Sequence, residues 1–272
     1  MAVYTTINDP SAHFQSNTYT GNGNNGKVIT NYGNSNLQPD FLWFKKRHNG
    51  SNRDHILINS TDGVTKNHRL PPSDPVYTNS NIVTSINTDG FTLGDASVSN
   101  EADDDFTCFQ WKLAGGTTTT NNDGSIACTI QVNSTAGFSM GKYSVSSSSG
   151  TVGHGLGAVP DFFIGKGDSS SGYYGMFPNK EGLNQSSGVN TTNDFSTVSG
   201  VTGFNTSTFA NGQGGGTHIF WAWKNVQGYF RAGQYTSNNN ADGPFIYTGF
   251  KPALIVFKMS SAGTSWRCFF FF

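Results

Sequence analysis

Charged side chains are scarce in this sequence. Lys, Arg, Asp and Glu make up 12% of the 272 residues, and the formal net charge is -1. A near-neutral surface gives no electrostatic footprint for nucleic acid or for an anionic membrane. The sequence also lacks an apolar run long enough to span a bilayer. We therefore expect no nucleic-acid partner and no membrane partner.

Cysteines and targeting signals are scarce as well. Cys108, Cys128 and Cys268 are odd in number and lack metal-site spacing, so a disulfide framework is not expected. Residues 1–7 contain neither the basic stretch nor the apolar core of a secretory signal peptide. These features predict assembly in a cytoplasm.

Helical periodicity is missing too. No stretch of about 12 residues places apolar side chains at a spacing of 3.6, so little or no helix is expected. The chain instead has 34 Gly and 22 Phe, and aromatic residues reach 14%. Aromatic side chains suit pleated, half-buried strands, and Gly and Asn suit the turns between them. The predicted fold is all-β, with tandem, jelly-roll-like β-sandwich units.

Uncharged polar tracts such as residues 146–150 raise disorder as an alternative. Disordered segments are poor in aromatic residues, whereas here aromatics recur in every apolar run. We therefore interpret these Asn-, Ser- and Gly-rich tracts as loops. Long irregular loops are expected around residues 67–82, 115–125 and 181–198.

Internal repetition organises the chain. Motif A is a Tyr followed by Gly, Asn or Ser residues, then a Pro that precedes an apolar strand ending in Lys. Its three copies span residues 19–45, 143–166 and 235–258, and six residues separate Pro from Lys in each. Proline belongs at a strand start or edge because it cannot donate to a ladder. Each copy therefore predicts a strand that begins near its proline.

Motif B occurs twice, at residues 89–112 and 202–224. It runs from Gly-Phe to a pair of aromatic residues two positions apart, which lie on one face of a strand and favour a core layer. The order along the chain is A, B, A, B, A. We predict one β-sandwich unit over residues 1–115, a second over 116–230, and a third, incomplete motif A over 231–272.

The last residues of the sequence, 269–272, are all Phe. Four exposed Phe side chains would be an aggregation liability. One hypothesis is that the natural protein is longer. The alternative is that a neighbouring subunit or the N-terminal segment covers this end.

The motifs resemble a module of marine bacteriophage tail-fibre-like and laminin-G-containing virion proteins. The residues that carry the resemblance are 9–15, 19–23, 37–40, 89–94, 151–161 and 241–250. The resemblance covers nearly the whole chain and implies a protein of the virion surface. It transfers no catalytic residue, and it implies that family members continue beyond Trp266, often into a lectin-like domain.

One stretch matches a catalytic pattern. Residues 137–141 read G-x-S-x-G, the nucleophile-elbow pattern, which requires a strand-to-helix turn on an α/β scaffold. No helical pattern follows it, so we interpret the stretch as the lead-in to a strand. No enzyme activity and no cofactor are predicted.

Two groups of residues are candidate metal ligands. Glu101, Asp103, Asp104 and Asp105 are an acidic cluster with oxygen ligands for Ca²⁺, but their spacing fits no defined loop. A solvated turn is the favoured interpretation. The six His residues are scattered and show no H-x-x-x-H spacing, so no metal site is predicted.

Five side chains are the candidate ligand or partner contacts. Lys45, Lys46 and Arg47 form a basic run that would contact phosphate or an anionic glycan, or would act as a charged strand end that limits edge pairing. Trp43 and Trp266 are candidate sugar-stacking aromatics. The charged strand end is the favoured interpretation of the basic run.

These observations predict a non-enzymatic bacteriophage virion structural protein, an external fibre, appendage or capsid-decoration subunit. Its expected partners are other virion proteins and copies of itself, as a homo-oligomer and a trimer if it belongs to a fibre. Its expected location is the virion surface. The alternative function is a host-glycan-binding adhesin.

Overall fold

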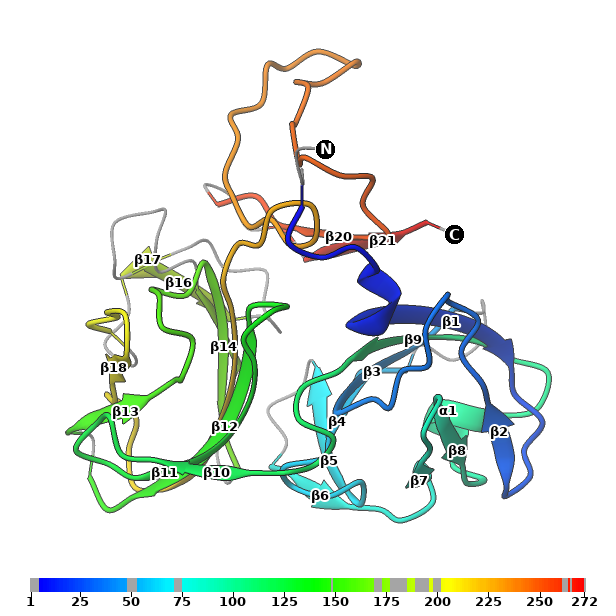
Figure 1. Cartoon of the computed structure of the whole chain (residues 1–272). Helices are drawn as coiled ribbons and strands as arrows, with labels where there is room; N and C mark the ends of the chain where they lie inside the picture. The colour runs from blue at the N-terminus through cyan, green and yellow to red at the C-terminus, as the bar shows by residue number, and fades with distance from the viewer. Residues whose placement is uncertain are drawn as a thin grey trace.

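The computed structural model describes residues 5–47, 53–70, 75–147, 149–168, 173–176, 185–188, 196–197, 202–260, 264 and 266–271. Two β bodies lie side by side, and a short hairpin lies across their upper ends (Figure 1). The predicted all-β fold is confirmed. The helical elements of the described part are the 3-10 turn η1 (Pro10–Ala12) and α1 (Ser97–Asn100), and no described helix has the length and apolar character to cross a membrane.

The first body contains a six-stranded antiparallel sheet. Its strands, in spatial order, are β1 (Phe14–Thr20), β9 (Asp105–Trp111), β3 (Phe41–Lys46), β4 (His55–Asn59), β5 (Lys66–Leu70) and β6 (Tyr77–Thr78). A smaller sheet covers its outer face, with the strand order β2 (Lys27–Ile29), β8 (Phe91–Leu93) and β7 (Val83–Ile86). The loop expected around residues 67–82 was wrong in part, because most of β5, all of β6 and the residues leading to β7 lie there.

The second body repeats this plan around an eight-stranded antiparallel sheet. Its strands, in spatial order, are β10 (Thr119–Asn121), β11 (Cys128–Asn133), β12 (Phe138–Val145), β19 (Gly216–Trp223), β14 (Phe162–Gly167), β15 (Tyr173–Met176), β16 (Gln185–Gly188) and β17 (Ser196–Thr197). A two-stranded sheet, β13 (Thr151–Gly153) with β18 (Thr208–Ala210), lies on its outer face. The expected loops at 115–125 and 181–198 therefore contain short strands.

The hairpin across the two bodies is β20 (Leu254–Phe257) paired with β21 (Arg267–Phe270). It is the third copy of motif A. In all three copies the strand after the proline begins two residues beyond it, at Phe41, Phe162 and Leu254. Motif A thus contains the first strand of a hairpin. Each motif B contributes one strand to a small sheet (β8 or β18) and one to a large sheet (β9 or β19).

The backbone conformation explains why the first motif B has glycine at position 90. Gly90 has a φ of 91°, and a Cβ there would lie 2.0 Å from the carbonyl oxygen of Ile29. Its amide donates to the Leu37 carbonyl oxygen at 2.9 Å. Only glycine combines this conformation with so close an approach, so the turn into β8 depends on it.

Three apolar clusters hold the layers together. The central cluster lies between the two large sheets and takes Phe41, Trp43 and Trp111 from the first and Trp221 and Trp223 from the second. An outer cluster fills the space under the small sheet of each body. The central strands of both large sheets, β3 and β9 in the first and β12 and β19 in the second, are therefore buried on both faces.

Successive side chains of β3 point to opposite faces of the sheet, so this one strand contributes to two clusters. Phe41 and Trp43 enter the central cluster, whereas Leu42 and Phe44 enter the outer one. The aromatic pairs of motif B were predicted to form a core layer, and both lie in the central cluster. This cluster joins the predicted units, whose boundaries at residues 115 and 230 stay a prediction.

Candidate functional site

The structure brings the basic run and the acidic cluster together. Lys46 is buried at the end of β3, where its ammonium ion-pairs with Asp104 and lies 2.7 Å from the Glu101 carboxylate. Hydrogen bonds to Asp104 and Glu101 raise the pKa of Lys46 above its ordinary value. The Lys46 ammonium therefore neutralises two of the four clustered carboxylates. It occupies the place that a bound cation would otherwise have beside them.

The neighbours of Lys46 also have partners inside the molecule. The Lys45 ammonium donates to the Arg53 carbonyl oxygen at 2.6 Å. The Arg47 guanidinium lies 5.2 Å from the ring centre of Phe270, at a distance typical of a cation–π contact. The end of β3 is thus tied to the following loop and to the hairpin β20–β21.

The two candidate tryptophans do not form one platform. Trp43 is 8% exposed, and its indole N–H donates to His55 Nδ1 at 2.8 Å. Burial lowers the pKa of His55 to about 3, with a smaller effect from Lys45, so the ring is neutral and can accept this hydrogen bond. Trp266 is half-buried and packs on Phe162, with ring centres 6.3 Å apart. The ligand roles suggested for Trp43, Lys45, Lys46, Arg47 and Trp266 stay predictions.

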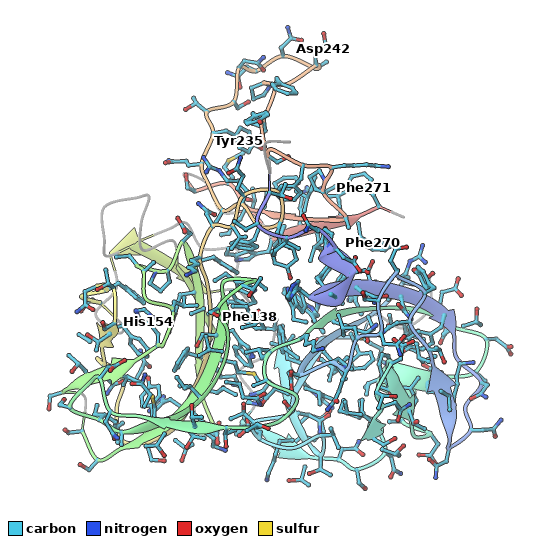
Figure 2. All side chains as sticks on the ribbon, viewed as in Figure 1. Phe138, His154, Tyr235, Asp242, Phe270 and Phe271 are labelled. Carbon is cyan, nitrogen blue, oxygen red and sulfur yellow. The ribbon has the colours of Figure 1, made fainter. Side chains whose placement is uncertain are left out.

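The G-x-S-x-G match lies at the start of β12. Ser139 is fully buried within this strand, and its hydroxyl donates to the His154 carbonyl oxygen at 2.5 Å. A nucleophile elbow needs an exposed hydroxyl on a strand-to-helix turn. The geometry of Ser139 is that of a buried strand residue, and His154, which lies within the second body, contacts it through its backbone carbonyl oxygen (Figure 2).

A polar cluster between the two bodies has no counterpart in the sequence predictions. Asp62 and His68 come from the first body, and Lys142 and Asp168 come from the second. The Asp62 carboxylate has no exposed surface. It ion-pairs with Lys142 and lies 3.0 Å from His68 Nε2. Lys142 also lies 3.5 Å from Asp168.

This cluster has the composition of a metal site. Asp62, His68 and Asp168 offer ligand atoms within 4.8 Å of one another. The Lys142 ammonium stands among these atoms and supplies the positive charge that an ion would bring. Burial opposes ionisation of Asp62, but His68 and Lys142 outweigh it and hold the pKa of the carboxyl below its usual range. We interpret the cluster as an ion-pair network that joins the bodies.

Exposed apolar side chains gather on one part of the described chain. Of eleven exposed large apolar residues, nine lie between residues 235 and 271. Phe245 is 90% exposed and Tyr247 78%, which no interior role explains. Tyr235 and Asp242 mark the arm that projects away from the bodies, and Phe271 lies near the end of the hairpin (Figure 2).

The hairpin β20–β21 has two different faces. Leu254, Cys268 and Phe270 pack against the central cluster, and burial raises the pKa of the Cys268 thiol to about 11. The opposite face is exposed, and there the rings of Phe257 and Phe269 stack with centres 5.6 Å apart. Of the terminal Phe residues that the structure describes, Phe270 packs against the central cluster, and Phe269 and Phe271 are exposed.

A shallow pocket of about 180 Å³ lies where the hairpin meets β1. It is lined by Gln15, Ser16, Tyr32, Gly33 and Phe271. The Tyr32 hydroxyl donates to the Ser16 carbonyl oxygen at 2.7 Å, which fixes an otherwise exposed ring. Two exposed aromatic rings beside polar groups are suited to a small polar ligand.

The comparisons with known proteins leave the function open. A family model described as a domain of unknown function (DUF7483) matches residues 9–270. Neither the curated proteins nor the solved structures gave a match.

Proposed function

The chain belongs to this family of unknown function, and we propose that it is a non-enzymatic structural protein of a bacteriophage virion. The observation that carries the proposal is the concentration of exposed apolar side chains between residues 235 and 271. A monomeric protein in water rarely exposes so many large apolar side chains on one segment, whereas an assembly subunit needs such a surface. The surface marks where the subunit joins its neighbours.

The character of the two bodies supports this proposal. The central strands of each large sheet are buried on both faces, and the loops between strands are polar and carry few charges. Such a module withstands exposure and presents little electrostatic attraction to nucleic acid. The resemblance of motifs A and B to tail-fibre-like virion modules points in the same direction.

The proposal places the protein on the virion surface as an external fibre, appendage or capsid-decoration subunit, after assembly in the cytoplasm of the bacterial host. Its partners are other virion proteins and copies of itself. A closed homo-oligomer satisfies the exposed surface of every copy, and a fibre would use a trimer.

Antibody labelling of virions tests this function. Antibodies against the intact chain are expected to label the outside of purified particles at regular positions in electron micrographs. Antibodies pre-absorbed with the purified chain are the control and should leave the particles unlabelled. Particles that remain unlabelled although infected cells contain the chain would contradict the proposal.

A second candidate function is a host-glycan adhesin, and the shallow pocket at Tyr32 and Phe271 favours it. Exposed aromatic rings stack on the apolar faces of sugars, while the Ser16 hydroxyl can hydrogen-bond the sugar hydroxyl groups. The pocket is separate from the core position of Trp43. It offers the ligand contact at a place that the sequence did not indicate.

A glycan array tests the adhesin function. Reproducible binding of the chain to a defined glycan is expected to fall at least tenfold in Tyr32→Ala, because the stacking surface is lost. Tyr247→Ala removes an aromatic ring that is 78% exposed elsewhere and serves as the matched control. Equal binding by both variants, or binding to no glycan, would exclude this function for the pocket.

A further inference from the structure

Lys46 carries its ammonium group in a shielded place at the end of β3. It lies on the same face of this strand as Leu42 and Phe44, which enter the outer cluster, and its side chain is 3% exposed. A lysine shielded from water has lost much of the hydration that keeps an ammonium group unreactive. The chemistry of Lys46 therefore depends on the groups that contact its Nζ atom.

Two carboxylates contact this Nζ atom, and their surroundings differ. The Asp104 carboxylate forms the closer ion pair, and its side chain is 13% exposed. The Glu101 Oε2 atom lies 2.7 Å from Nζ, and its side chain is 36% exposed. The arrangement brings together a nitrogen that can act as a nucleophile, a shielded carboxyl carbon, and a second carboxylate that can exchange protons with solvent.

Backbone hydrogen bonds on both sides hold Asp104 in this position. The Gly21 amide donates to the Asp104 carbonyl oxygen at 2.7 Å, and the Arg47 amide donates to the Asp105 carbonyl oxygen at 2.7 Å. Position 21 requires glycine, since a Cβ there would lie 2.0 Å from the Glu101 carbonyl oxygen. Groups that the fold already holds in contact need no further ordering before they react, and this ordering is a large part of the barrier to joining two groups.

The second body forms the same strand pairing without these three side chains. The register of β14 on β19 repeats that of β3 on β9, so the equivalent residues can be read from it. They are Gly167 for Lys46, Gln213 for Glu101 and Gly216 for Asp104. Because the pairing does not require the three charged groups, their joint presence in the first body calls for an explanation specific to that body.

We propose that Lys46 and Asp104 condense to form an intramolecular amide, with Glu101 as the catalytic residue that carries the proton. The Lys46 ammonium gives one proton to Glu101, and the Nζ lone pair attacks Cγ of Asp104. A C–N bond forms and one C–O bond breaks. The departing oxygen takes the proton from Glu101 and a second proton from Nζ, and it leaves as water. No oxidation or reduction occurs, and one ammonium and one carboxylate become a neutral amide.

The surroundings of Lys46 favour the amide over the ion pair. Keeping two charges away from water is costly, and a neutral amide removes this cost. The low exposure of Lys46 and Asp104 also restricts the water that hydrolysis of the amide would need. Hydrogen bonds to the two carboxylates raise the pKa of Lys46, so the free amine is a minor species. The link is therefore expected to form slowly, after the chain has folded.

The link would close residues 46–104 into a covalent loop that contains β4 to β8 and α1. It would tie the end of β3 to the chain just before β9, where the two strands are already paired. A cross-link of this kind restricts the unfolded chain as a disulfide does, but it persists under reducing conditions. This inference goes beyond the proposed function and does not depend on it.

Intact-mass spectrometry of the purified chain tests the link. Condensation removes one water, so after prolonged incubation the mass is expected to fall about 18 Da below the mass of the sequence. Protease digestion and fragmentation should then yield one branched peptide that contains both Lys46 and Asp104. A full mass after incubation, or a missing water located at the Lys142–Asp62 pair or any other residue, would overturn the proposal.

Three variants test the roles of the groups. Lys46→Arg keeps the positive charge but removes the amine, so its mass should match its sequence. Glu101→Gln cannot accept the proton, and the loss of water should be at least about tenfold slower. Asp105→Asn is the matched control: this neighbouring carboxylate accepts a hydrogen bond from the Thr20 hydroxyl at 2.8 Å, and its loss should leave the rate unchanged.

Equal rates in Glu101→Gln and Asp105→Asn would overturn the catalytic role of Glu101. Far-UV circular dichroism checks that the variants are folded, and the result on the native chain does not depend on any variant. Virion labelling is independent of these masses, so failure here does not imply failure of the proposed function.

Discussion

Trp221→Ala is expected to lower the free energy of unfolding by about 4 kcal/mol. Trp221 is fully buried in the central cluster, where its ring centre lies 5.4 Å from that of Phe41 and 5.5 Å from that of His68. The substitution leaves a large cavity, and the two flanking sheets cannot both collapse into it. Because Phe41 and His68 belong to the other body, the loss is expected to destabilise both bodies in one transition.

Equilibrium unfolding in urea, followed by tryptophan fluorescence and far-UV circular dichroism, measures this effect. Tyr247→Ala is the matched control: its ring is 78% exposed, and its loss should change the free energy by less than about 0.5 kcal/mol. A cost below about 1.5 kcal/mol for Trp221→Ala, or separate transitions for the two bodies, would show that the central cluster does not couple them.

Asp62→Ala is the second substitution with a large expected effect, a loss of about 3–5 kcal/mol. Asp62 is the acceptor for Lys142 and His68, and its carboxylate has no exposed surface. Removing it leaves the Lys142 ammonium beside Asp168 alone and takes one partner from His68, at a junction between the two bodies. Breaking a buried pair costs more than the pair itself contributes, since the Lys142 ammonium, whose side chain is 32% exposed, has lost part of its water.

The contribution of Asp62 also has a defined pH dependence. Its pKa in the folded protein lies below the value of about 3.9 for an unperturbed Asp. A depressed carboxyl pKa stabilises the fold above the unfolded pKa, and this contribution is lost as the pH falls through the folded pKa. The difference in unfolding free energy between the native chain and Asp62→Ala should therefore be constant above about pH 5 and shrink below about pH 4.

Denaturant unfolding between pH 3 and pH 7 measures both effects. Asp242→Ala is the control, because Asp242 lies on the projecting arm and should change neither the stability nor its pH dependence (Figure 2). The double variant Asp62→Leu with Lys142→Met removes both charges and should recover part of the lost stability. A pH-independent difference, or no recovery in the double variant, would contradict the ion-pair interpretation.

Much of the fold could be predicted because it depends on local patterns. The Pro of motif A precedes a strand in all three copies, as its position predicted, and the aromatic pairs of motif B lie on the strands β9 and β19. The strand β5, of sequence KNHRL, could not be predicted, because the partners that bury its polar side chains come from other strands and loops. Asn67 and His68 find these partners across the sheet and at the junction with the second body.

The candidate sites were harder to predict. Lys46 was identified as a surface contact, and the structure buries it against Glu101 and Asp104. The cluster of Asp62, His68, Lys142 and Asp168 has no sequence signal, because no spacing rule relates residues that meet only when two sheets pack. The exposed pocket at Tyr32 and Phe271 likewise joins the two ends of the chain.

The sequence by itself determined the all-β class, the strand starts and the order A, B, A, B, A, because turn residues and period-two alternation act over a few residues. Tertiary structure alone decided that the aromatic pairs of motif B face a core shared by both bodies. It alone also decided that one face of the hairpin β20–β21, with Ile255, Phe257 and Phe269, is exposed. A local pattern predicts that a side chain will be buried, but the strands that cover it can lie far along the chain, as β9 and β3 do in the first body.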